Sequence, residues 1–152
     1  MPDRTRGIAN EAWEALLTAH AILMRQFAAA DFWREVSMRE YDVLYTLAKC
    51  PGTTRQSELE RHVLLSQPAI SRLVDRLVTR GLLARTVDPG DRRGVLLTLT
   101  DEGRAVQRRV GTRHARDVAR AVGGRLTGAE LAELQRLATQ LAGGGEQRES
   151  GS

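Results

Sequence analysis

The chain has 152 residues, with 23 basic and 19 acidic side chains and a formal net charge of +4. Hydrophobic residues make up 41% of it, enough for a buried core in a chain of single-domain length. It has neither the run of about 18 apolar residues that a membrane span needs nor an apolar secretion signal at its start, so we expect a cytoplasmic protein. Its single cysteine, Cys50, can form no internal disulfide and no zinc site alone, and we expect no cofactor.

The basic residues are concentrated in the middle of the chain. Residues 55–109 carry eleven basic and seven acidic side chains, whereas residues 1–54 carry six and seven, and residues 110–152 carry six and five. Arginine supplies all the bases except Lys49, which we interpret mainly as compositional bias. The pI near 10.2 is therefore weak support for nucleic-acid binding, and the position of the basic excess is more informative.

Two helices are predicted in the first third of the chain. Apolar residues recur at three- and four-residue spacing from residue 8 to about residue 29, which indicates a long first helix. Ser37 is followed three residues later by Glu40, the capping-box pattern, and a second apolar stripe continues from there. Residues 51–52, a Pro-Gly pair, end this second helix.

The next segment predicts a helix-turn-helix. Residues 55–63 have helical spacing, and Ser66 is an N-cap residue followed by a proline suited to the first turn. The helix that begins there keeps its apolar residues on one face and ends at Gly81. Two short helices joined by a tight turn form the helix-turn-helix unit.

A β-hairpin is predicted after this unit. Residues 83–87 and 95–99 read as strands, and residues 88–94 between them are rich in turn formers. Arg92 and Arg93 are expected at the projecting tip. A helix-turn-helix followed by a basic-tipped hairpin is the winged-helix arrangement.

Two further helices are predicted in the last third of the chain. Residues 100–102 supply a cap and first-turn acids for one helix, which Gly123 and Gly124 interrupt. Thr127 and Glu130 form a second capping box before a narrow seam of leucines. The expected fold is therefore mainly α with a small β-wing, of the α+β class.

The winged-helix parts suit duplex DNA. A helix fills the major groove, where glutamine can pair with adenine and arginine with guanine, and a wing arginine can enter the minor groove. We expect Asp91 to aim the Arg93 guanidinium by a charge-assisted hydrogen bond. The alternative is a solvated helix face and an ordinary charged hairpin. The candidate DNA-binding residues are Ser66, Gln67, Ser71, Arg72, Arg76, Asp91, Arg92 and Arg93.

The run over residues 88–100, followed by Glu102-Gly103, resembles the wing signature of the MarR family of bacterial transcriptional regulators. Residues 37–52, 66–81 and 126–141 resemble that family's second, recognition and last helices. The resemblance implies a homodimer whose first and last two helices pair, leaving two lobes to bind a palindromic operator in double-stranded DNA. It also places Ser71, Arg72 and Arg76 of the recognition helix in the major groove. The wing-tip pair, Asp91 and Arg93, is placed in the minor groove.

We therefore expect one domain over residues 1–142. Its dimerisation helices would lie at about 8–29 and 101–142, its winged helix-turn-helix at about 37–100, and residues 143–152 would be a disordered tail. The apolar faces at both ends favour a homodimer, because they exceed what one lobe needs. A monomer that packs its own terminal helices together is the alternative.

The resemblance also places an effector pocket where the first two helices meet the DNA-binding lobe. All six aromatic residues lie between residues 13 and 45, so a small aromatic carboxylate or phenol would suit such a pocket. Trp13 and Tyr41 are the candidate ligand-binding walls, with His20 and Arg39 as anion partners; alternatively they are core or interface residues. We expect a repressor that the ligand releases from DNA. A constitutive or architectural winged-helix protein without an effector is the alternative.

Enzymatic function is not expected, and no catalytic residue is assigned. The sequence lacks a nucleophile elbow, a phosphate-binding glycine loop followed by lysine, and a zinc-protease motif. Cys50 lies near the end of a predicted helix, where the dipole disfavours a thiolate, so we expect it to be structural. His62 and His114 have no partner at metal-binding spacing, and no metal is expected.

Overall fold

The computed structural model describes residues 2–63 and 65–143, so the tail predicted over 143–152 lies outside the described residues except for Gly143. The chain divides into two compact units, residues 1–114 and 115–152. The elements in chain order are α1 (Pro2–Ala28), the 3₁₀ turn η1 (Asp31–Arg34), α2 (Met38–Lys49), β1 (Thr54–Arg55), α3 (Gln56–His62), α4 (Gln67–Thr79), β2 (Leu83–Asp88), β3 (Asp91–Leu99), α5 (Asp101–Val118), the π-helical turn η2 (Ala119–Gly123) and α6 (Gly128–Gly143).

The helix α1 begins earlier than its apolar pattern predicts, at Pro2 instead of residue 8. Polar residues extend a helix without contributing to an apolar stripe, and a proline fits the first turn because no amide donor is needed there. In α2 the predicted capping box is confirmed: the Glu40 amide donates to Ser37 Oγ at 3.1 Å, and the Ser37 amide donates to Glu40 Oε2 at 2.8 Å.

The helix-turn-helix is confirmed as α3 and α4. The amphipathic pattern of α4 gives it one buried face, formed by Ile70, Leu73, Val74 and Leu77. Gly81 follows the helix with φ +73°, a left-handed conformation that glycine adopts without strain. The chain can therefore turn directly from α4 into β2.

The sheet has three antiparallel strands in the order β1-β3-β2. The hairpin of β2 and β3 was predicted, but β1 was not. Its two residues pair with β3, Thr54 opposite Leu97 and Arg55 opposite Leu96. A strand of two residues is too short to show an alternating pattern, so only pairing with β3 defines it.

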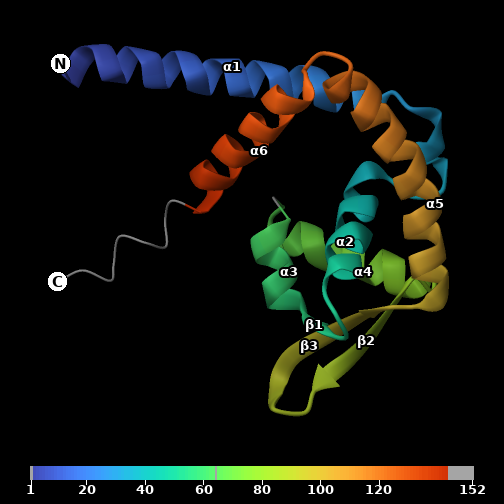
Figure 1. The fold of residues 1–152 in the computed structure, drawn as a ribbon. Coiled ribbons are helices and arrows are strands. Elements are labelled where there is room, and N and C mark those ends of the chain that lie inside the picture. The colour runs from blue at the N-terminus through green and yellow to red at the C-terminus, as the bar shows by residue number, and fades with distance from the viewer. Residues whose placement is uncertain (1, 64, 144–152) are drawn as a thin grey trace. The chain divides into compact units, whose positions relative to one another are not determined.

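The core of the 1–114 unit lies among α2, α3, α4, the sheet and the start of α5 (Figure 1). Its largest fully buried side chains are Leu44, Leu59, Ile70, Leu77, Leu97, Val36, Val43 and Val74. The apolar side chains at helical spacing in α2 and α4 thus share one core with the alternate, buried side chains of β3. The mainly α fold with a small β-wing is confirmed.

In the 115–152 unit, α5 ends in the π-helical turn η2, and α6 follows after the predicted glycine interruption. The second capping box is confirmed, because the Thr127 amide donates to Glu130 Oε2 at 2.8 Å and the Glu130 amide donates to Thr127 Oγ1 at 3.3 Å. The Thr127 amide and hydroxyl both donate to Glu130 Oε2, and these two bonds lower the pKa of the Glu130 carboxyl. No residue of α6 that the structure describes is buried.

Candidate nucleic-acid interface

The exposed side of α4 is polar and basic. Gln67, Arg72 and Arg76 are all exposed, opposite the buried apolar face of the helix. Because Arg72 and Arg76 are four residues apart, their side chains lie on the same side. A helix that presents two guanidinium groups and an amide in this way offers the donors that read base edges in the major groove.

Two of the predicted contact residues on α4 already make hydrogen bonds within the fold. Ser66 Oγ accepts from the Ala69 amide at 3.4 Å and so caps the helix. Ser71, which is half-buried, accepts at Oγ from Gln56 Nε2 at 3.2 Å, which joins α3 to α4. These serines therefore have structural roles in addition to any contact with DNA.

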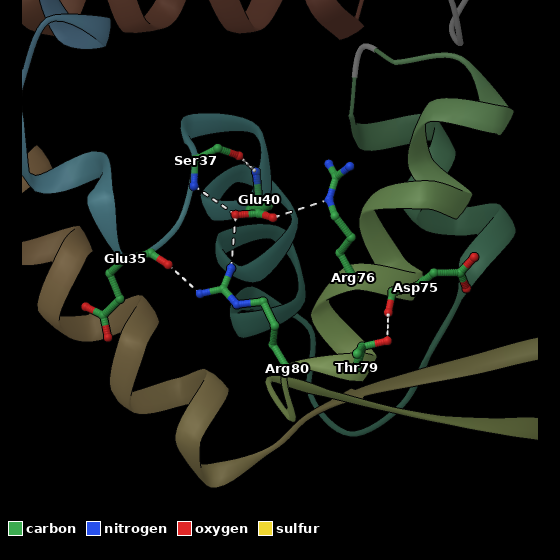
Figure 2. A network of polar contacts seen from close by, with 7 residues as sticks. All are labelled: Glu35, Ser37, Glu40, Asp75, Arg76, Thr79 and Arg80. Atoms are coloured by element: carbon green, nitrogen blue, oxygen red, sulfur yellow. Dashed lines mark hydrogen bonds and ion pairs between the residues drawn. The ribbon is translucent and has the colours of Figure 1, made fainter.

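Arg76 is paired with a carboxylate at the start of α2 (Figure 2). Its Nε lies 3.6 Å from Glu40 Oε1, and Arg80 Nη1 lies 3.3 Å from Glu40 Oε2. Arg80 also donates through Nη2 to the main-chain carbonyl of Glu35. The capping role of Glu40 was predicted from the sequence, but its contacts with α4 were not, because they join residues about 40 positions apart.

Arg39 lies beside the recognition helix. Together with Arg72 and Arg76 it borders a groove of about 230 Å³ between the start of α2 and α4. Among the described residues, the lining is Ser37, Arg39, Leu65, Ala69, Arg72, Leu73 and Arg76. Three arginines around one groove create a site for anionic groups such as phosphates. Arg39 was predicted to share a ligand pocket with Tyr41, but Arg39 borders this groove whereas Tyr41 lies in the core.

The wing differs in detail from its prediction. β2 extends to Asp88 and β3 begins at Asp91, so the turn contains only Pro89 and Gly90. The pairing moves from Val87 opposite Val95 directly to Asp88 opposite Asp91, which leaves residues 92–94 as an irregularity in β3. Arg92 and Arg93 therefore lie in a bulge beside the turn, both exposed, and not at the tip itself.

The expected bond between Asp91 and the guanidinium of Arg93 is also corrected. Asp91 Oδ1 accepts from the main-chain amide of Arg93 at 3.0 Å. A carboxylate two residues before an amide readily forms this local bond, because it orders the backbone without fixing a long side chain. Asp91 thus shapes the bulge that carries the arginines.

The residues that support the wing beside its turn were not predicted from the sequence. Asp88 is buried, its Oδ2 lies 2.6 Å from Arg55 Nη2, and its Oδ1 accepts from the Gly90 amide at 2.9 Å. A Cβ at Gly94 would lie 3.1 Å from the Asp88 Cβ, so glycine permits this close approach. The only sequence signal was an aspartate beside a turn proline, which does not reveal its partner Arg55.

The four predicted ligand residues do not converge in the described structure. Trp13 and His20 are exposed on α1, and the exposed fraction of the Trp13 side chain is 58%. Tyr41 is buried, and Arg39 borders the groove at α4.

Tyr41 belongs to an aromatic cluster around His114. The His114 ring centroid lies 5.2 Å from that of Phe27, 5.4 Å from Trp33 and 5.7 Å from Tyr41. Burial raises the pKa of Tyr41, opposed by its hydrogen bond with Gln107. Among the described residues, His114 Nδ1 is a buried polar atom with no hydrogen-bond partner.

The place of His114 in this cluster was not predicted, although the sequence contains a signal for it. Val106 and Val110 lie eight and four residues before His114, so all three share the apolar face of α5. Both valines are buried. The spacing could therefore have predicted a half-buried histidine there.

A second cavity, of about 310 Å³, lies between η1 and α5. It is lined by Phe32, Glu35, Arg109, Val110 and Arg113. Arg109 pairs with Glu35, and this hydrogen bond is the main cause that raises the pKa of Arg109. No ion pair of Arg113 is found within the described part of the chain, so this guanidinium is the available cation of the cavity.

Other classes of site have no support in the described residues. No group of three or more metal-ligating side chains occurs among residues 4–63 and 65–143. The helices described there include none long and apolar enough to cross a membrane. Cys50 is a half-buried free thiol at the end of α2.

Comparison with known proteins identifies the relatives of this arrangement. A sequence model of the MarR family matches residues 35–94. Sco3205, a MarR family transcriptional regulator from Streptomyces coelicolor solved in complex with DNA, is 29% identical, and the alignment covers 92% of this chain and 89% of that chain with a TM-score of 0.78.

Two further similar structures are of a regulator in complex with its natural ligand and of a protein whose DNA binding a small molecule regulates. PcaV, a transcriptional regulator from Streptomyces coelicolor solved with its natural ligand, is 34% identical over 88% of this chain and 90% of that chain, with a TM-score of 0.66. BpsR from Bordetella bronchiseptica, whose DNA binding is regulated by 6-hydroxynicotinic acid, is 25% identical over 86% of this chain and 91% of that chain, with a TM-score of 0.75. The similarity extends well beyond the winged helix.

Proposed function

The chain belongs to the MarR family of transcriptional regulators, and from this premise we propose that it is a homodimeric repressor of a palindromic operator. In this proposal α4 enters the major groove and the bulged wing follows the minor groove. The residues proposed to contact DNA are Ser66, Gln67, Ser71, Arg72, Arg76, Arg92 and Arg93, joined by Arg39, with Asp91 shaping the wing.

The observation that carries the proposal is the arginine-bordered groove along α4. Arg39, Arg72 and Arg76 surround a volume of about 230 Å³ on the exposed side of the helix. Guanidinium groups in such a place neutralise phosphates and can pair with guanine. The solved complex of Sco3205 with DNA supports the same use of this fold.

The proposal of a homodimer rests on exposed apolar side chains in α1 and α6. The exposed fractions are 58% for Trp13, 47% for Leu17, 44% for Leu137 and 74% for Leu141. Large apolar patches on a protein surface usually mark an interaction site. A second copy of the chain would cover both helices and hold two α4 helices at the spacing of half-sites.

An aromatic carboxylate or phenol is proposed as the effector. PcaV has a natural ligand and BpsR responds to an aromatic acid, which supports this class of molecule. Within this chain, the cavity lined by Phe32 and Arg113 suits an aromatic anion better than the groove bordered by Arg39, because it offers both an aromatic side chain and an available cation. Trp13, His20 and Tyr41 would contribute only if the second copy encloses them.

DNA binding tests the main proposal directly. A duplex selected by the protein from a random-sequence pool should be palindromic, and its affinity should fall steeply with salt. If two lobes neutralise about eight phosphates, log K should change with log salt with a slope of about −7. Equal affinity for selected and scrambled duplexes would contradict specific regulation.

Ligand titration separates a regulated repressor from a constitutive binder. Salicylate-like acids and phenols are titrated into the protein with and without the selected duplex. A ligand that weakens DNA binding tenfold must bind the DNA-free protein tenfold better, a coupling of about 1.4 kcal/mol. Arg113→Gln should abolish this response, whereas the control Arg116→Gln should keep it. Identical affinity in both states for every acid tested would favour the constitutive alternative.

A further inference from the structure

The Glu40 carboxylate is a buried charge at the meeting point of α2 and α4. Glu40 is 8% exposed. Its Oε2 accepts from the Ser37 amide at 2.8 Å and lies 3.3 Å from Arg80 Nη1, while its Oε1 lies 3.6 Å from Arg76 Nε. One carboxylate therefore caps α2 and binds two arginines of the recognition-helix segment.

The geometry of the contact matters because a guanidinium is a rigid, planar group with five donor hydrogens. Glu40 contacts Arg76 at Nε, and no ion pair of its two terminal nitrogens is found within the described residues. Figure 2 shows these nitrogens beyond Nε. They are the pair that donates to a guanine edge or to a phosphate.

The second arginine keeps the carboxylate in place. Arg80 contacts Glu40 with one terminal nitrogen and the Glu35 carbonyl with the other, so it spans from the end of α4 to the segment before α2 (Figure 2). The two arginine side chains are partly exposed, but the Glu40 carboxylate is buried, and a buried charge is costly unless it is paired and hydrogen-bonded. The Glu40 oxygens therefore have a fixed orientation toward Arg76.

We propose that Glu40 is a positioning residue for DNA recognition: it holds Arg76 by Nε so that the two terminal nitrogens face the groove. This inference rests on the proposed DNA-binding function. It assigns to Glu40 an effect on sequence preference that a helix cap alone would not have. Glu40 itself does not touch DNA in this proposal.

The first test is made on the protein without DNA. Proton–nitrogen correlation spectra resolve arginine Nε–H groups, and Arg76→Lys identifies the signal of Arg76. Solvent exchange of this Nε–H should be slower than that of Arg72, and Glu40→Gln should accelerate it. An Arg76 signal that exchanges as fast as that of Arg72, and is unchanged by Glu40→Gln, would overturn the proposal.

The second test measures the preference for the selected duplex over a scrambled one. Glu40→Gln keeps an acceptor for the Ser37 amide but loses the charge, so the preference should fall about five- to tenfold. Affinity for the scrambled duplex should not fall, because a negative charge has been removed. The matched control is Glu130→Gln, which makes the same change in a capping box where no arginine pair is described. This control should leave the preference unchanged.

A double variant identifies the route of the effect. In an Arg76→Ala background, Glu40→Gln should no longer change the preference, since its target is gone. A preference that is unchanged in the single variant, or reduced equally in both backgrounds, would refute positioning while the DNA-binding function stands.

Two further outcomes are decisive. If Glu40→Gln does not fold, Arg76→Lys serves instead, because lysine keeps the positive charge but has no guanidinium Nε–H for Glu40 to contact. An unchanged preference in this variant would also refute the proposal. If the wild-type protein shows no preference at all, the proposed function fails, and the exchange measurement still decides whether Glu40 holds Arg76.

Discussion

The winged-helix region and the terminal helices bury their apolar side chains to very different extents. Leu44 of α2 and Ile70 of α4 are 0% exposed, whereas Trp13 of α1 and Leu141 of α6 are 58% and 74% exposed. Both regions have helical apolar stripes in the sequence. An apolar stripe therefore predicts a helix that needs a partner, but not whether that partner belongs to the same chain.

This difference has consequences for stability. The winged-helix region has its own core, and its contribution to folding should not depend on protein concentration. If a second copy covers the terminal helices, as proposed, this part of the stability should depend on concentration. The following predictions test this contrast, from the largest expected effect to the smallest.

Leu44→Ala should remove about 2–5 kcal/mol from the free energy of unfolding, because it leaves a cavity in the core of the 1–114 unit. Denaturant unfolding at two protein concentrations measures this. The loss should be the same at both concentrations. A loss below about 1 kcal/mol would mean that this core does not hold the winged helix together.

Leu137→Asp should dissociate the proposed dimer, because it places a charge within the leucine seam of α6. Operator affinity should fall about 100-fold or more, since two half-sites are no longer bound by linked lobes. Sedimentation and DNA titration measure both effects, while the circular dichroism of the winged helix should remain. Gln135→Asp, on the same helix outside the seam, is the control and should remain dimeric; a dimeric Leu137→Asp would locate the interface elsewhere.

Arg72→Ala should cost about 1–3 kcal/mol of binding per half-site and relax the preference at one base position if the side chain pairs with guanine. A contact with phosphate would weaken all sequences alike. Binding to a panel of duplexes, each with one substituted position, distinguishes the two. Arg120→Ala removes the same charge outside the winged helix and should have little effect. Unchanged affinity for every duplex would exclude Arg72 from the interface.

Asp91→Ala should have the smallest effect, a loss of up to about 1 kcal/mol in DNA affinity with unchanged thermal stability, because the wing bulge loses one ordering hydrogen bond. Asp91→Asn keeps an acceptor for the Arg93 amide and should bind DNA as the wild type does. If the asparagine variant is as weak as the alanine variant, the carboxylate acts through its charge and not through the backbone bond.

Much of this protein was determined by local sequence. The capping box at Ser37 and Glu40, the N-cap at Ser66 and the stop at Gly81 each depend on residues within a few positions, so their patterns were sufficient. The amphipathic stripes of α2 and α4 likewise predicted the buried faces. The candidate DNA-contact residues followed from the order of these elements and from the resemblance to a family.

Tertiary structure alone decided what distant residues do to one another. Pairing with β3 defined β1 and shortened the wing turn to two residues, since strand register depends on the partner strand. Folding also brought Glu40 to Arg76, Arg55 to Asp88, and His114 into a ring of aromatic side chains. A charge or an imidazole in a sequence has many possible partners, and only the packing of α2, α4 and α5 selects one of them.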